Sequence, residues 1–252
     1  MFIRQILILA CGLLWSLAGV AQIPAELRFS GALGWYPIFP SQDKKMVLPA
    51  LGNDIAQELA RRLNVKASWT RDVPWARLWT MMDDGDLDLI VGGANNAERK
   101  EKYLVLEPFM TSSYHAYVPW GKQFKFEKLE DLRGKAVARG LGSKYGDEYE
   151  TFLKESNSPV QDIGGGVKEN LFPMLAAGRM DYIVQDPVDA NYWLKQNRME
   201  GQFVPLPRPI WTSDVYIFLS KKSPWAKDAA LLRKTLQDMK KDGFLASALA
   251  KY

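Results

Sequence analysis

The sequence predicts an α/β protein with a parallel or mixed sheet, and two observations lead to that class. Short apolar runs of strand length alternate with amphipathic helical segments, and the connections between them are short. One pattern also occurs twice: a helical segment, a Gly-x-x-Asp turn and an apolar strand, at Gly85–Asp88 and again at Gly178–Asp181. This repeat predicts two similar α/β lobes.

The first residues are predicted to be a secretion signal that is not part of the fold. Residues 1–21 contain Arg4, continue in an apolar run and end in Gly19-Val20-Ala21, a small-residue cleavage motif. The run is short for a membrane span, which needs about 20 apolar residues. Cys11 is the only cysteine, so a chain beginning at Gln22 has no disulfide and no catalytic thiol. A lipid anchor on Cys11 is the alternative, but the apolar run continues past it.

Composition and charge exclude several classes of function. The 33 Lys and Arg residues against 29 Asp and Glu give a net charge of +4, without the concentrated basic stripe of a nucleic-acid-binding protein. The chain has one histidine, its acidic spacings do not match an EF-hand, and its glycines match neither a dinucleotide nor a P-loop fingerprint. We therefore expect no metal, no cofactor and no nucleic-acid partner.

In the first part of the chain, strands and helices alternate. Strands are predicted at residues 27–30, 65–70 and 87–91, because these runs are apolar and bounded by turn residues. Helices are predicted at 55–63, capped by Asn53 and Asp54, and from Pro74 onward.

The strand at 87–91 is the one around which a ligand site is expected. Gly92 and Gly93 follow it and allow a close approach of the backbone, because neither has a Cβ. Arg99 comes shortly after and offers a permanently charged, rigid fork for a carboxylate. Open α/β sheets bind ligands at the carboxyl ends of their strands. A plain connection with a surface arginine is the alternative.

Aromatic residues near these strands are candidates for the apolar wall of a site. The loop 31–40 carries Trp35, Tyr36 and Phe39. Phe39 is assigned to the core, whereas Tyr36 is compatible with either core or ligand. Trp75, at the start of the second helix, belongs either to the core or to a site wall.

The second part of the chain repeats the alternation. Strands are predicted at 103–109, 114–118, 135–139, 182–184 and 215–219, and helices at 145–154, 170–177, 188–195, 225–241 and the end of the chain. Gly142 and Ser143 lie between a strand and a helix start, whose free N–H groups suit a small anion; simple turn chemistry is the alternative. Asp186 ends the strand 182–184 in the corresponding way.

These segments, in this order, resemble the periplasmic solute-binding proteins of polar amino-acid ABC transporters, the bacterial extracellular solute-binding protein family 3. The likeness covers about residues 27–252. It rests on Gly34–Phe39, Asp54–Ala56, Val73–Trp75, Gly85–Asp88, Glu98–Arg99, Leu129–Lys135, Gly142–Ser143, Gly178–Asp181, Gln185–Asp186 and Lys241–Gly243. No single segment is specific, and their common order carries the resemblance.

The resemblance implies a type II periplasmic-binding clamp, in which two hinge strands near 116–120 and 215–220 join two lobes. Lobe 1 is expected to comprise residues 22–116 and 217–252, and lobe 2 residues 117–216. The implied function is that of a monomeric, non-enzymatic periplasmic protein. It would capture a small amino acid and deliver it to an ABC transporter permease in the inner membrane.

The resemblance also implies roles for single residues. Arg99 would hold the ligand α-carboxylate, Ser143 would bond it from the other lobe, and Asp186 would bind the α-ammonium. Tyr36 would pack on the ligand side chain. The remaining candidates for the site are Trp75, Gly93, Asn95 and Gly142.

The chain departs from the family pattern at three positions. The run Gly-Gly-Ala-Asn-Asn lacks the usual hydroxyl residue, so Asn95 is expected to donate to the carboxylate instead. Lys144 replaces a second hydroxyl residue and would favour an acidic ligand or face solvent. Leu33 stands where members that bind basic amino acids tend to carry an acid, which argues against lysine or arginine as the ligand.

Two other functions stay open at this level. One is a periplasmic enzyme similar to cyclohexadienyl dehydratases, which needs a positioned acid or base, although His115 is assigned to the core or surface. The other is a ligand sensor for a membrane receptor. For the binding protein, Arg99→Ala and Asp186→Ala are each expected to nearly abolish amino-acid binding and leave thermal stability almost unchanged, because both residues lie at strand ends that face a cleft and not in an apolar stripe.

Overall fold

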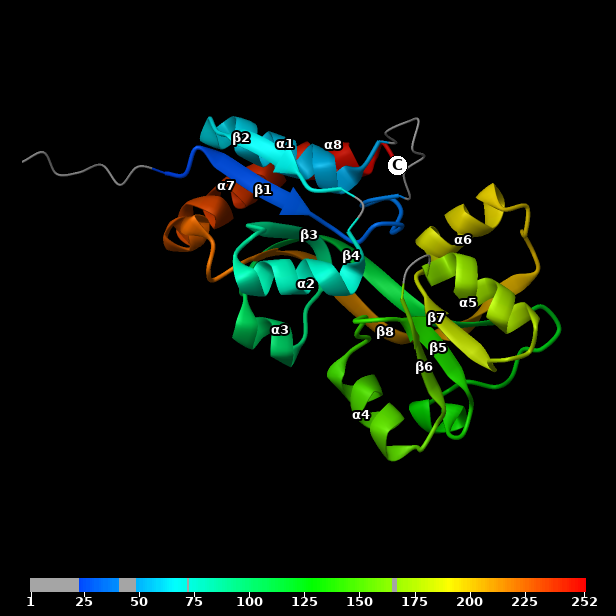
Figure 1. Ribbon diagram of the computed structural model, residues 1–252. Coiled ribbons are helices and arrows are strands. Elements are labelled where there is room, and N and C mark those ends of the chain that lie inside the picture. The colour runs from blue at the N-terminus through cyan, green and yellow to red at the C-terminus, as the bar shows by residue number, and fades with distance from the viewer. Residues whose placement is uncertain (1–22, 41–48, 72, 165–166) are drawn as a thin grey trace, which may run out of the picture.

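The computed structural model describes residues 23–40, 49–71, 73–164 and 167–252, so the predicted secretion signal lies outside the described residues. Its strands form a mixed sheet in the order β2-β1-β3-β8-β4-β7-β5-β6 (Figure 1). The pairs β1–β2, β1–β3, β5–β6 and β5–β7 are parallel, whereas β4 and β8 pair antiparallel in the middle. Helices flank the sheet in two lobes, and the predicted α/β class is confirmed.

The first lobe is built on β1 (Glu26–Ser30), β2 (Lys66–Trp69) and β3 (Leu89–Ala94). Its helices are α1 (Leu51–Leu63), α2 (Trp75–Asp84), α3 (Ala97–Lys102), η2 (Pro224–Asp228), α7 (Ala229–Lys241) and α8 (Phe244–Leu249). The end of the chain therefore returns to the lobe in which the described residues begin (Figure 1). Buried residues of both ends share one core cluster, which includes Leu27, Phe29, Trp225 and Leu236.

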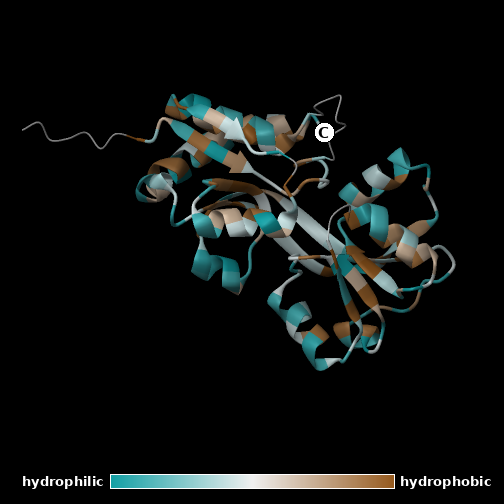
Figure 2. Cartoon of the chain, viewed as in Figure 1, coloured by the Kyte–Doolittle hydropathy of each residue, from teal (hydrophilic) through white to brown (hydrophobic). Residues whose placement is uncertain are grey.

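The second lobe contains β5 (Val137–Gly140), β6 (Val160–Ile163) and β7 (Tyr182–Gln185). Its helices are η1 (Leu129–Leu132), α4 (Asp147–Glu155), α5 (Val167–Ala176) and α6 (Pro187–Gln196). Successive side chains of a strand point to opposite faces, and Tyr182 and Ile183 accordingly belong to different core clusters. Helices cover both faces of this part of the sheet, and the apolar strands lie between more hydrophilic helix surfaces (Figure 2).

Two long strands join the lobes. β4 (Leu104–Pro119) and β8 (Phe203–Leu219) run antiparallel through both lobes. The two strands predicted at 103–109 and 114–118 are thus one, and the strand predicted at 215–219 begins 12 residues earlier, at Phe203. The first half of β8 was not predicted as a strand because it contains Pro205, Pro207 and Pro209, and proline is rare in the middle of a sheet.

The repeated Gly-x-x-Asp turn has the same structural role in both lobes. Each glycine has a positive φ, +83° at Gly85 and +66° at Gly178. Each aspartate then accepts a backbone N–H from the neighbouring part of the sheet: Asp88 from Arg28 at 2.8 Å and Asp181 from Ala136 at 2.7 Å. The repeat therefore pins one strand to the next and sets the register of the sheet whose strand ends carry the site.

Arg62 ties α1 to the C-terminal helices, and Glu58 holds Arg62 in place, so we expect replacement of Glu58 to reveal this link. Glu58 accepts hydrogen bonds from Arg61 and Arg62, and Arg62 also bonds Asp242 at 2.6 Å. Arg61 foremost, with Arg62, lowers the pKa of Glu58 to about 2. Glu58→Gln should lower the free energy of unfolding at pH 7 by about 1 kcal/mol.

The pH dependence of this difference checks its origin. A carboxylate whose pKa is lower in the folded state stabilises above its unfolded pKa, and that stabilisation disappears as pH falls through the folded pKa. The parent and Glu58→Gln should therefore converge in urea unfolding experiments between about pH 4.5 and pH 2. A difference that is constant over this range would assign the loss to packing instead.

Candidate functional site

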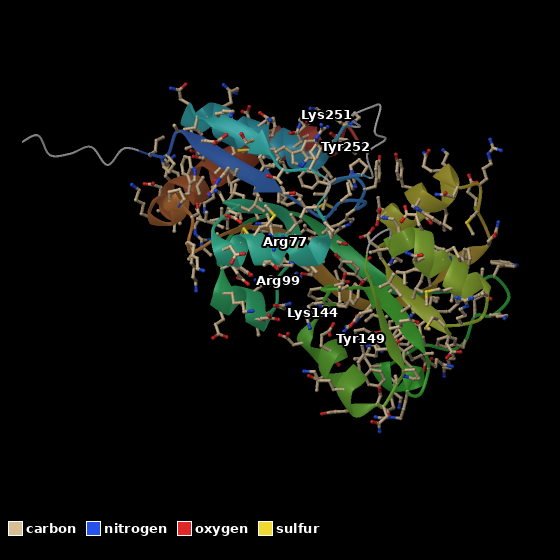
Figure 3. All side chains as sticks on the ribbon, in the orientation of Figure 1. Arg77, Arg99, Lys144, Tyr149, Lys251 and Tyr252 are labelled. Carbon is tan, nitrogen blue, oxygen red and sulfur yellow. The ribbon has the colours of Figure 1, made fainter. Side chains whose placement is uncertain are left out.

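A cavity of about 130 Å³ lies between the two lobes. It is on the order of the ~150 Å³ engineered cavity that holds benzene, so it suits a small molecule. The first lobe contributes the loop after β1, the start of α2 and the segment after β3, with Leu33, Trp35, Trp75 and Arg99. From β4 and the second lobe come Tyr114, Ser143, Lys144, Tyr145, Val167, Lys168, Gln185, Asp186 and Asp189. Arg99 and Lys144 belong to different lobes and both line the cavity (Figure 3).

Arg99 is a buried cation without an acidic partner. Asn96 caps α3 and accepts the Arg99 backbone N–H at 2.8 Å, and the Arg99 guanidinium donates to the Ala94 carbonyl at 2.6 Å. The guanidinium carbon lies 4.2 Å from the ring centroid of Trp79 and 5.4 Å from that of Trp75. Arg99 is 6% exposed, and no carboxylate in the described part of the chain forms an ion pair with it. Burial lowers its pKa to about 10, so it keeps its charge at neutral pH.

Asp186 is a buried anion in the same cavity wall. It follows β7 and caps α6, accepting the N–H groups of Val188 at 2.8 Å and Asp189 at 3.1 Å. Ser112 donates its hydroxyl to the other carboxylate oxygen. Asp186 is 6% exposed, and among the described residues no lysine or arginine pairs with it. Because this aspartate caps a helix, we now expect Asp186→Ala to cost stability as well, in place of the expectation that it leaves stability unchanged.

Lys168 and Asp189 form an ion pair inside the cavity wall. Their closest N–O distance is 2.6 Å, and both residues are buried. Both also reach the first lobe: Lys168 donates to the Gly34 carbonyl, and Asp189 accepts the Tyr36 N–H at 2.9 Å. Burial raises the pKa of Asp189, although Lys168 acts in the opposite direction. The pair therefore joins the lobes and cancels its own charge.

The charges of the cavity are balanced except for two. Lys168 and Asp189 neutralise each other, and Lys144 is partly exposed with its Nζ 3.9 Å from Glu150. Arg99 and Asp186 are left, each buried and each without an ionic partner among the described residues. A buried charge without a partner is costly. The cavity is therefore complementary to a molecule that carries one anionic and one cationic group.

Ser143 lines the cavity, but not at a helix start. α4 begins at Asp147, after the N-cap Gly146, and its first turn contains Asp147, Glu148 and Glu150. These acids oppose an anion at that helix end, so the expected helix-start anion site is not formed. Ser143 instead lies in the preceding loop, where its hydroxyl bonds Tyr145. Its contribution to a ligand is that of a single hydroxyl.

Trp35 occupies the place that was expected for Tyr36. The Tyr36 ring stacks on Tyr192 with ring centroids 4.0 Å apart, and its hydroxyl donates to the carbonyl of Tyr252 at 2.8 Å. Tyr36 thus links the lobes beside the cavity. Trp35 lines the cavity, with its ring 6.3 Å from that of Tyr114, which also lines it.

Three other candidates, Gly93, Gly142 and Asn95, do not line the cavity. A Cβ on Gly93 would be 2.9 Å from the ring of Phe218, so this glycine serves the packing of β3. Gly142 has φ +78°, and a Cβ there would be 3.4 Å from Ala76 of the other lobe, so it allows the lobes to approach. Asn95 does not line the cavity, and its buried side-chain oxygen has no partner among the described residues. The remaining candidate, Trp75, does line the cavity.

His115 lies outside the cavity and bonds groups of β4 and β8. The His115 Nδ1 lies 2.8 Å from the Leu206 carbonyl, and Nε2 lies 3.3 Å from the Ser113 hydroxyl. Within residues 23–40, 49–71, 73–164 and 167–252 there is no cluster of potential metal ligands, and no helix is long and apolar enough to cross a membrane.

Comparison with known families identifies the fold and its class. Residues 31–252 match the model of the bacterial extracellular solute-binding proteins, family 3. The chain belongs to this family. The L-cystine-binding protein TcyJ of Escherichia coli K12 is 29% identical over 161 residues, 64% of this chain and 59% of TcyJ. The putative amino-acid ABC transporter-binding protein PatH of Vibrio harveyi is 23% identical over 93% of this chain and 91% of PatH.

The fold of this solute-binding protein is also found in a solved structure. A mutant of ArgBP from T. maritima superposes with a TM-score of 0.75 at 22% identity, covering 90% of this chain and 95% of ArgBP. The expected two-lobed type II clamp is thereby confirmed. Family membership and fold together agree with the class that the sequence resembles, the solute-binding proteins.

Proposed function

We propose that this protein captures an α-amino acid between its two lobes and delivers it to an ABC transporter. The observation that supports this proposal is a pair of opposite charges in one small cavity, Arg99 and Asp186, which lack ionic partners within the described part of the chain. An α-amino acid carries a carboxylate and an ammonium on one carbon, and so supplies both missing partners. The family, and the names of TcyJ and PatH, support the same class of ligand.

The main polar and aromatic side chains of the cavity have roles in this proposal. Arg99 binds the α-carboxylate with its free N–H groups, and Trp75 and Trp79 hold the guanidinium in place. The hydroxyl of Ser143 bonds the same carboxylate from the second lobe. Asp186 binds the α-ammonium, while its helix cap and Ser112 fix its orientation. Trp35 and Tyr114 cover the apolar part of the ligand.

Ligand binding stabilises the closed arrangement of the lobes. Arg99 belongs to the first lobe and Asp186 to the second, so one ligand holds both. We place the lobe boundaries at residues 22–116 with 217–252, and at 117–216, which puts the change of lobe within β4 and β8. A ligand that binds only the closed form shifts the population toward it.

The family and the first residues support a proposal for the cellular setting. We propose that residues 1–21 direct secretion, that the mature monomer works in the periplasm, and that an inner-membrane permease is its partner. The extracellular class of the family and the transporter-binding class of PatH support this setting. Neither separates transport from the signalling alternative, which would use the same site.

A thermal-shift screen tests the proposed ligand class. The purified mature protein is heated with each standard L-amino acid, L-cystine, small dicarboxylates and prephenate. A ligand at 100 times its dissociation constant adds about 2.7 kcal/mol to the free energy of unfolding, which gives a clear shift. Shifts with one or a few amino acids support the proposal. Shifts with dicarboxylates alone, or conversion of prephenate, would contradict it.

A further inference from the structure

The ion pair between Lys168 and Asp189 bears on the chemical class of the ligand side chain. The inference rests on the proposed function, in which Arg99 and Asp186 bind the two groups common to all α-amino acids. The variable side chain must then meet the rest of the cavity wall. The charged residues left in that wall are Lys144, Lys168 and Asp189.

Lys168 has no donor left for a ligand. An ammonium group has three N–H donors. The Lys168 ammonium has three acceptors: the Asp189 oxygens at 2.7 and 2.6 Å and the Gly34 carbonyl. An acidic ligand side chain would therefore have to displace Asp189 or Gly34 from it.

The Asp189 carboxylate, like the Lys168 ammonium, already has hydrogen-bond partners in the protein. One of its oxygens also accepts the Tyr36 N–H at 2.9 Å. A basic ligand side chain would have to compete with Lys168 for this carboxylate in a site where both residues are at most 7% exposed. Breaking a buried pair by removing one partner is strongly destabilising.

The other residues of the wall add no buried charge. Lys144 is 38% exposed in its side chain and lies near Glu150, so it faces solvent and a carboxylate of its own lobe. Leu33, Trp35 and Val167 are apolar and lie near the loop that Lys168 holds. Apart from Arg99 and Asp186, the charged residues of the wall are thus either partly exposed or paired with each other.

We propose that Lys168 and Asp189 determine specificity: by neutralising each other, they select an amino acid whose side chain carries no net charge. The same pair holds the Gly34–Tyr36 loop of the first lobe against the second. A ligand side chain that competes for Lys168 or Asp189 would also weaken the contact between the lobes. Selection of the ligand is therefore coupled to closure of the lobes.

Calorimetric titration of the parent and three variants tests this proposal. The probes are L-leucine, L-glutamine, L-cystine, L-arginine and L-glutamate. In the parent, the best of the first three should bind at least about tenfold more tightly than L-arginine or L-glutamate. Lys168→Met leaves Asp189 unpaired and should move the affinity ratio by about tenfold toward L-arginine. Asp189→Asn should move it toward L-glutamate by a similar factor.

The double variant Lys168→Met with Asp189→Asn is the matched control. It removes both charges, so it should restore the preference for uncharged side chains even if closure is weaker. The proposal is overturned if the parent prefers L-arginine or L-glutamate, or if both single variants keep the parent's ratios. If one single variant does not fold, the other decides. Absence of binding to every amino acid of the thermal-shift screen would instead refute the proposed function.

Discussion

Arg99→Ala is expected to weaken amino-acid binding by roughly 30-fold to several thousand-fold, the equivalent of about 2–5 kcal/mol. The guanidinium is the buried cation of the cavity that lacks an acidic partner among the described residues, and the ligand α-carboxylate would supply that partner. Without it, the carboxylate would be buried with only the Ser143 hydroxyl and local backbone groups. Calorimetric titration with the amino acid that gives the largest thermal shift measures the loss.

Arg77→Ala is the matched control for this variant. Arg77 lies on α2 in the same lobe, is exposed and does not line the cavity (Figure 3). The Arg77→Ala variant removes the same charge as Arg99→Ala, and it should bind the amino acid as tightly as the parent does. The unliganded Arg99→Ala protein should unfold within about 1 kcal/mol of the parent, because relief of the buried charge offsets the lost bond to Ala94. Equal affinity of Arg99→Ala and the parent would remove Arg99 from the site.

Asp186→Asn is expected to cause a similar loss of affinity with little loss of stability. The amide keeps a side-chain oxygen for the N–H groups of Val188 and Asp189, and asparagine caps helices as well as aspartate does. What it lacks is the charge that would pair with the ligand ammonium. We expect a loss of roughly 30-fold or more in the dissociation constant.

Asp186→Ala separates the two roles of this carboxylate. It removes the cap of α6 and the bond from Ser112, so it should also lower the free energy of unfolding by about 1–2 kcal/mol. Urea unfolding of the unliganded parent and both variants measures this cost. If Asp186→Asn binds as tightly as the parent, Asp186 is a structural cap and the ammonium partner lies elsewhere.

The sequence predicted the secondary-structure elements well where the hydrophobic periodicity and the flanking turn residues indicate the same boundaries. The strands at β1, β3, β5 and β7 are apolar runs between glycines, aspartates and prolines, and all were found within a few residues. β6 was missed because Val160–Asp162 are exposed at the edge of the sheet, which leaves no apolar run to detect. The first half of β8 was missed because its prolines mask an extended chain.

The site was predictable as far as it depends on strand ends. Arg99 and Asp186 each follow a strand, and the fold brings both into one cavity with Trp75 and Ser143. The choice between Trp35 and Tyr36 was not predictable, because it depends on the β-bridge between Trp35 and Phe39 and on the distant Tyr192.

Lys168 and Asp189 were missed because they come from different helices, α5 and α6. Their ion pair exists only in the tertiary structure, and nothing near Lys168 in the sequence indicates its partner. The one available signal was the position of Asp189, three residues after Asp186 on the same helix face.

The central claim is that the cavity needs both charges of a zwitterion, and one set of titrations tests it directly. The amino acid with the largest thermal shift is compared with its decarboxylated amine and its deaminated acid, which keep the side chain. The account predicts that each analogue binds at least about 30-fold more weakly than the amino acid, because each leaves Arg99 or Asp186 unpaired. An analogue that binds as tightly as the amino acid would contradict it.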